Sequence, residues 1–172
     1  GLYFASGGND NMMYVYSPKT DLPLMKKQHK AAVRAIAWSE RQYGVLASGA
    51  GTADRCIRLW NLNENKKIDM RDTESQVSNI IFSRKENEII TSHGFSKNDI
   101  CIWKTKGLRK THSLLGHASR VLHLAMSPCG NYIVSGAGDE TLRFWSLNYT
   151  QKQDTPDKKD VAFNSFQINL LR

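Results

Sequence analysis

The sequence predicts an all-β protein of the β-propeller class, built from repeated units. An aromatic residue recurs at intervals of 44, 43 and 42 residues, at Tyr16, Trp60, Trp103 and Trp145. A glycine-containing turn and a short alternating apolar run precede each aromatic, and other short runs rich in Val and Ile fill the units. Such runs, separated by polar turns, favour antiparallel strands. A period of about 40–45 residues with four strands per unit is typical of a WD-repeat propeller blade.

The units share one order of strands and turns. The glycine turn and the strand that ends in the aromatic occupy residues 5–17, 47–61, 91–104 and 134–146. An apolar strand opens three of the units, at "QHKAAVRAIAWS", "SQVSNIIFS" and "GHASRVLHLAMS", and a polar turn with a second strand follows it. The middle unit has no histidine at its opening. The first unit lacks its opening strand, so we expect about three and a half blades.

The glycines of "GAGTAD", residues 49–54, could form a phosphate-binding loop or a turn between strands. Glycine permits the positive φ angles that tight strand connections need. A phosphate loop needs a following Lys-Ser/Thr and a helix, and neither follows here. We therefore interpret the glycines as a turn.

Two units carry the same four polar or aromatic residues. They are His29, Ser48, Asp54 and Trp60 in one unit and His117, Ser135, Asp139 and Trp145 in another. Histidine, serine and aspartate are the ingredients of a hydrolase triad, but an enzyme needs only one such site. We expect instead a structural network in each of these two blades. In it the imidazole bridges aspartate and serine, and the indole N–H adds a further hydrogen-bond donor. The sequence thus predicts no enzyme.

The composition fits one folded domain and excludes several classes. The chain has 172 residues, 40% of them hydrophobic, and no apolar run near the roughly 18 residues of a membrane span. The beginning of the chain shows no signal peptide. The cysteines, Cys56, Cys101 and Cys129, match no metal motif or disulfide framework. We expect a protein of the nucleus and cytoplasm without metal or cofactor.

The net charge of +8 suits an acidic partner, but the charges are scattered between apolar runs. No nucleic-acid-binding module accompanies them. We therefore predict neither a nucleic-acid nor a membrane partner.

After Trp145 the sequence shows no clear fourth strand, because residues 146–160 are very polar. We expect propeller blades over residues 1–147 and a polar tether over residues 148–172 that ends in Leu171 and Arg172. The outer strand of the last blade should then come from elsewhere in a longer parent protein.

Residues 2–146 resemble the Fizzy and Fizzy-related family, the co-activators and substrate receptors of the anaphase-promoting complex. The resemblance rests on "LYFASGGNDN", "AAVRAIAW", "GAGTADRCIRLWN", "SHGFSKNDICIW", "GHASRVLHLAMSPCG" and "GAGDETLRFW". It implies a seven-bladed propeller, of which this chain would be the C-terminal half. It also implies binding to ligase subunits and to degron-bearing substrates or inhibitors. "GTADRCIR" and "AAVRAIAWS" are closer to the Fizzy-related branch.

The resemblance also implies binding residues. The positions that match the KEN-box site are Asn9, Asn11, Thr52, Gln76 and Arg120. Glu140 matches the residue that meets the arginine of a destruction box. Leu171 and Arg172 match the Ile-Arg tail that docks into helical-repeat subunits of the ligase, with leucine in place of isoleucine.

Three alternatives stay open. Asn9 and Asn11 could be turn formers, with Arg120 an ordinary surface residue. The whole protein could be a WD-repeat scaffold of another complex that lacks degron binding. Alternatively, it could use its net charge of +8 to bind nucleic acid.

Overall fold

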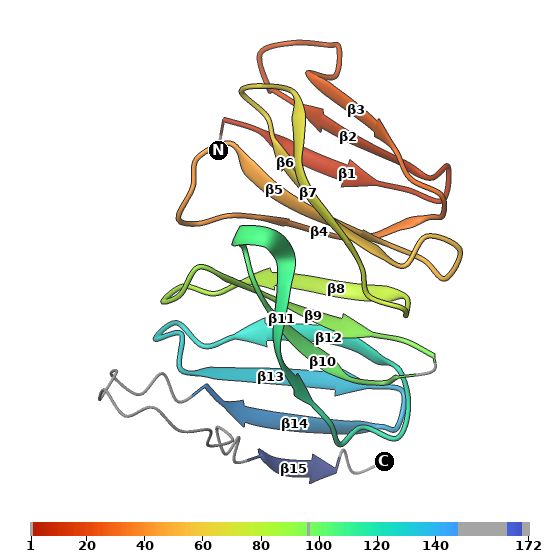
Figure 1. Ribbon diagram of the computed structural model, residues 1–172, viewed down its shortest axis with the longest axis vertical. Helices are drawn as coiled ribbons and strands as arrows, with labels where there is room; N and C mark the ends of the chain where they lie inside the picture. The colour runs from red at the N-terminus through yellow and green to blue at the C-terminus, as the bar shows by residue number, and fades with distance from the viewer. Residues whose placement is uncertain (1, 96, 148–164, 170–172) are drawn as a thin grey trace.

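A computed structural model describes residues 2–95, 97–147 and 165–169, and this part of the chain forms four antiparallel sheets (Figure 1). The first sheet has three strands, β1 (Phe4–Gly7), β2 (Met12–Tyr16) and β3 (Met25–Gln28). The second has β4 (Val33–Trp38), β5 (Val45–Ala50), β6 (Cys56–Asn61) and β7 (Lys66–Asp72). The third has β8 (Val77–Phe82), β9 (Glu88–His93), β10 (Ile100–Lys104) and β11 (Arg109–Leu114). The fourth has β12 (Val121–Met126), β13 (Tyr132–Ala137), β14 (Thr141–Ser146) and β15 (Ser165–Asn169).

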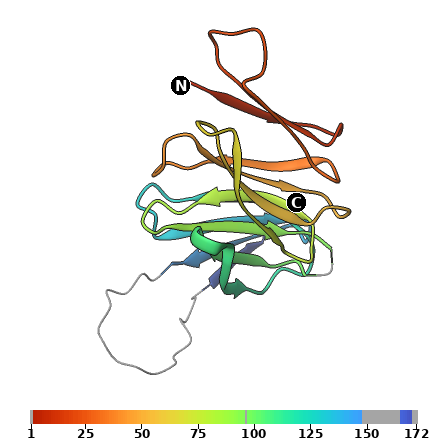
Figure 2. The ribbon, with the colours of Figure 1, turned by 45° about the horizontal axis from the view of Figure 1, so that its top comes forward.

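In each sheet the strands follow one another in chain order, and the sheets are stacked in the same order (Figures 1 and 2). The first strands of the complete sheets meet, since β4 contacts β8 and β8 contacts β12. The three-stranded sheet has no such first strand in the described residues, and β1 contacts β4 as β5 contacts β8. This is the arrangement of propeller blades around a common centre, which confirms the predicted fold class.

Adjacent sheets approach closely at two glycines. A Cβ atom on Gly49 would lie 2.4 Å from Cγ1 of Val77, and one on Gly7 would lie 2.6 Å from Cγ1 of Val33. Both distances are far inside van der Waals contact. Here glycine is required by the neighbouring blade.

The hydrophobic core lies between the sheets. Successive side chains of a strand point to opposite faces, so the side chains of β10 contribute to two hydrophobic clusters, one on each face of the third sheet. Cys101 and Trp103 pack toward the second sheet, whereas Ile100 and Ile102 pack toward the fourth. Trp60 likewise faces the first sheet, where it packs beside Met13.

The outer strand of the fourth sheet comes from the chain itself, which corrects one expectation. β15 pairs antiparallel with β14, from Trp145 opposite Ser165 to Thr141 opposite Asn169. Most of the polar run, residues 148–160, lies outside the described residues, and the alternating segment after it was overlooked. The division into a 1–147 domain and a 148–172 tether stays a prediction, since residues 148–164 and 170–172 lie outside the described residues.

The one helix in the described ranges, η1 (Lys106–Leu108), is three residues long. No described helix has the length and apolarity to cross a membrane.

Candidate degron-binding face and buried polar networks

The same turn recurs at one end of all four sheets, on the right in Figure 1. Each turn contains a residue with positive φ, five positions before the recurring aromatic. These residues are Asn11 (φ 65°), Arg55 (φ 55°), Asn98 (φ 49°) and Glu140 (φ 62°). Asparagine adopts this conformation more readily than arginine or glutamate. Asn11 therefore has a turn-forming role whatever else it binds.

Three of these turns each contain an aspartate whose side chain stabilises the turn. Its Oδ1 atom accepts a hydrogen bond from the backbone N–H two residues on, a local bond typical of aspartate in turns. The donors are Met12 for Asp10 (3.0 Å), Cys56 for Asp54 (3.1 Å) and Thr141 for Asp139 (3.1 Å). In the third sheet Lys97 occupies this position and pairs with Glu74.

The structure places the five KEN-box candidates at this end of the sheets and brings two of them into direct contact. Thr52 donates from Oγ1 to Oε1 of Gln76 at 3.4 Å. Asn9 and Asn11 lie in the β1–β2 turn. Among the described residues, no hydrogen bond joins either asparagine to Thr52, Gln76 or Arg120.

Arg120 lies over an aromatic ring that the sequence reasoning missed. Its guanidinium carbon is 5.2 Å from the ring centroid of Phe95, and the Phe95 side chain is 68% exposed. Phe95 follows Gly94 as Thr52 follows Gly51, so it occupies the repeat position of a candidate binding residue. Aligning the repeats at their glycines could have found it.

Gln76 and Arg120 occupy equivalent positions. Each directly precedes a buried valine, and each backbone carbonyl accepts a hydrogen bond from a glycine N–H, at 3.1 Å from Gly94 and 3.0 Å from Gly138. These backbone hydrogen bonds fix the positions of Gln76 and Arg120 at this end of their sheets. Glu140 lies in the β13–β14 turn at the same end and is exposed.

The fourth sheet contains the expected polar network. His117 contacts Oδ2 of Asp139 through Nδ1 (2.9 Å) and Oγ of Ser135 through Nε2 (2.7 Å). Trp145 donates from Nε1 to the same serine oxygen at 2.8 Å. Partial burial alone would raise the pKa of Asp139, but hydrogen bonds from Thr141, His117 and the backbone outweigh it and hold this pKa well below its usual range.

The second sheet differs from the expectation at its aspartate. His29 and Trp60 contact Oγ of Ser48, both at 2.8 Å, but Asp54 does not bind the imidazole. Its two oxygens instead accept hydrogen bonds from Nη1 and Nη2 of Arg58, at 2.7 and 2.9 Å, in a buried bidentate ion pair. Burial, and then the Arg58 charge, lower the pKa of His29 to about 4.

The third sheet builds a network with a histidine from another place. His93 at the end of β9 contacts Oγ1 of Thr91 through Nε2 at 2.8 Å, and Trp103 donates to the same oxygen at 2.8 Å. His93 lies two residues after Thr91 and therefore on the same face of the strand. It takes the place of the histidine that this repeat lacks at its opening. Sequence reasoning missed it by looking only before the first strand.

Leu171 and Arg172, the predicted docking tail, lie outside the described residues.

The family description "WD domain, G-beta repeat" matches residues 22–61 and 108–146. "Protein FIZZY-RELATED 1" of Arabidopsis thaliana is 48% identical over 169 residues, which are 98% of this chain and 35% of that protein. "APC/C activator protein CDH1" of Saccharomyces cerevisiae is 48% identical over 163 residues, 94% of this chain and 29% of that protein. A chain of the solved "Crystal Structure of Mitotic Checkpoint Complex" matches with a TM-score of 0.82 and 40% identity, over 85% of this chain and 46% of that one. The chain thus spans about a third of the length of the curated relatives.

Proposed function

Because the chain belongs to the Fizzy and Fizzy-related family of WD-repeat proteins, we propose that it is part of a substrate-recognition co-activator of the anaphase-promoting complex. The printed name of the yeast relative, an APC/C activator, supports this role. The checkpoint-complex structure supports partners that include inhibitors of the ligase. The protein is non-catalytic in this proposal and acts in the nucleus and cytoplasm.

The arrangement around Arg120 is the observation that carries degron binding. Phe95 holds the exposed guanidinium over its ring, and such preorganisation lowers the entropic cost of binding. A carboxylate can accept a charge-assisted pair of hydrogen bonds from this group. Arg120 therefore binds the glutamate of a Lys-Glu-Asn motif.

Gln76 and Thr52 complete the polar part of this surface. The hydrogen bond between them orients the Gln76 amide, which can both donate and accept. We assign these two side chains, with Asn9 and Asn11, to the lysine and asparagine of the motif. Glu140 provides the carboxylate for the arginine of a destruction box, and the Leu171–Arg172 tail docks into helical-repeat subunits of the ligase.

Fluorescence anisotropy of a labelled Lys-Glu-Asn peptide tests the proposal on the full-length protein. We expect saturable binding that a scrambled peptide does not show and that Arg120→Glu weakens at least tenfold, about 1.4 kcal/mol. Arg109→Glu makes the same charge change on the outer strand β11 and should leave binding unchanged.

No binding by a folded protein would instead favour a scaffold role in another complex. Nucleic-acid binding that falls steeply with salt would favour the charge-based alternative.

A further inference from the structure

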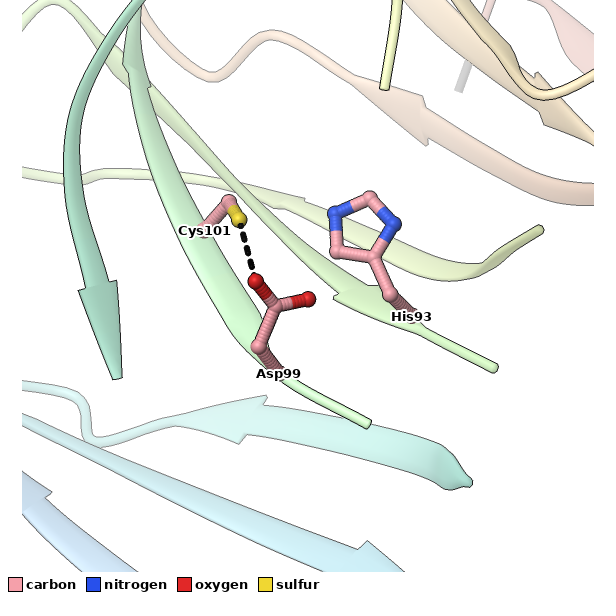
Figure 3. Close-up of side chains that lie close together, drawn as sticks. All are labelled: His93, Asp99 and Cys101. Carbon is pink, nitrogen blue, oxygen red and sulfur yellow. Dashed lines mark hydrogen bonds between the residues drawn. The ribbon is translucent and has the colours of Figure 1, made fainter. Parts of the chain in front are cut away.

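We propose that His93, Asp99 and Cys101 form a binding site for a zinc-like divalent cation inside the third sheet. One nitrogen, one oxygen and one sulfur ligand atom from these residues lie within 4.8 Å of one another. The three residues are 1%, 3% and 2% exposed. Figure 3 shows the side chains converging from the end of β9 and the start of β10. The inference is independent of degron binding.

The strand register brings these residues together. β9 and β10 are antiparallel, with Thr91 opposite Cys101. The backbone N–H of His93 donates to the carbonyl of Asp99 at 2.9 Å, so the pairing continues to that point. Because side chains two residues apart share a face, Asp99 and Cys101 point to the same side as His93.

The Asp99 carboxylate is the second observation that points to a ligand. Its Oδ2 atom receives the Cys101 thiol, with Sγ at 3.2 Å, whereas its Oδ1 atom is buried and has no hydrogen-bond partner within the described ranges. Figure 3 shows the oxygen that takes no part in the thiol bond directed toward His93. A buried carboxylate oxygen without a partner is costly, and a bound cation would satisfy it.

The donor set suits zinc better than magnesium or calcium. Zinc binds imidazole nitrogen, thiolate sulfur and carboxylate oxygen, whereas the harder cations require mostly oxygen ligands. Zinc ligands at about 2.0–2.3 Å from the metal lie roughly 3.3–3.8 Å apart, so binding needs only a small approach of those ligand atoms that lie near the 4.8 Å limit. A water molecule can take the fourth position.

Binding exchanges one proton for the metal. The thiol proton of Cys101 leaves for solvent, and the resulting thiolate forms the sulfur–metal bond without any change of oxidation state. Burial, and then Asp99, raise the pKa of the Cys101 thiol to about 12 in the metal-free protein. In its neutral form, His93 offers a nitrogen lone pair to the metal and releases no proton. Coordination through Nε2 replaces the Thr91 bond, while Thr91 keeps its bond from Trp103.

The other two complete sheets lack this ligand set. Aligned on the recurring glycine and tryptophan, the equivalent residues are Ala50, Cys56 and Arg58 in the second sheet and Ala137, Thr141 and Arg143 in the fourth. An arginine in place of Cys101 would repel a cation. The site is therefore a property of the third sheet and not of the repeat.

Cobalt(II) titration of the reduced, metal-free, full-length protein tests the site, because a cobalt–thiolate bond gives a charge-transfer absorption band. We expect a band that saturates at one ion per chain and disappears when zinc is added. Cys101→Ser should abolish it, and Asp99→Asn should weaken cobalt binding at least tenfold. Cys129→Ser removes an exposed cysteine outside the cluster and should leave the band unchanged.

Circular dichroism establishes that each variant is folded, and Cys101→Val serves if the serine variant is not. Absence of the band in the folded wild-type protein would overturn the proposal. Its survival in the Cys101 variant, or its loss in Cys129→Ser, would do the same by placing the metal elsewhere.

Discussion

Arg58 binds both carboxylate oxygens of Asp54, at 2.7 and 2.9 Å, and so holds the group that His29 would otherwise contact. In the fourth sheet the equivalent aspartate, Asp139, receives the hydroxyl of Thr141 at 2.7 Å and the imidazole of His117 at 2.9 Å. Cys56 occupies, in the second sheet, the repeat position that Thr141 occupies in the fourth. The second sheet therefore lacks this hydroxyl donor, and the arginine provides two strong donors instead.

Removal of Arg58 should be strongly destabilising. Arg58→Ala leaves the Asp54 carboxylate buried without its charged partner, and breaking a buried ion pair costs about 3–5 kcal/mol of unfolding free energy. The pKa of His29 should rise at the same time, because the Arg58 charge contributes to lowering it. Urea denaturation and NMR titration of the full-length protein measure the two effects. A variant as stable as wild type would contradict the buried pair.

The two opening histidines should differ in their contribution to stability. His117→Ala removes one hydrogen-bond partner from each of Asp139 and Ser135, and we expect a loss of about 2 kcal/mol of unfolding free energy. His29→Ala removes only the contact with Ser48, so its loss should be smaller. Thermal melting of the two variants side by side gives the comparison. Equal losses would show that the bond to Asp139 adds no stability.

Stability should fall as the pH drops from about 6.5 to about 4. The pKa of His29 is near 6.5 in the unfolded chain and is lowered to about 4 by burial and by Arg58. Between these values the unfolded chain holds more protons, so the free energy of unfolding rises with pH and reaches its full value above 6.5. The slope from one histidine is at most about 1.4 kcal/mol per pH unit. Urea denaturation across this range should give a shallower slope for His29→Gln, and identical slopes would refute the assignment.

At Glu140 a substitution can remove the side-chain charge while keeping the backbone conformation of the turn. Asparagine adopts positive φ readily, so Glu140→Asn keeps the β13–β14 turn while removing the carboxylate. We expect a variant that is folded by circular dichroism, with at least tenfold weaker binding of a labelled destruction-box peptide to the full-length protein. Glu140→Asp, which keeps the charge, is the matched control. Equal affinity of the asparagine variant and wild type would exclude Glu140 from the arginine site.

The repeat period, the strands and the glycine turns could be predicted because they depend on local spacing. Residues two apart share a strand face, and glycine or asparagine allows the turn, wherever the segment lies. The recurrence of Trp60, Trp103 and Trp145 was therefore sufficient to identify the blades. The resemblance, not the spacing, provided the degron-binding candidates.

Only the tertiary structure decided which polar groups became partners. Arg58 and His29 compete for one carboxylate, and the outcome depends on distances and burial that no spacing reports. His93, at the end of β9, contacts Thr91 in place of a histidine before the first strand of the sheet. The strand β15 pairs with β14 although a polar run separates them in the sequence. Sequence periodicity records the local geometry of each strand. The choice among partners is made by packing, because a buried polar group takes the donor or acceptor that the fold brings within reach.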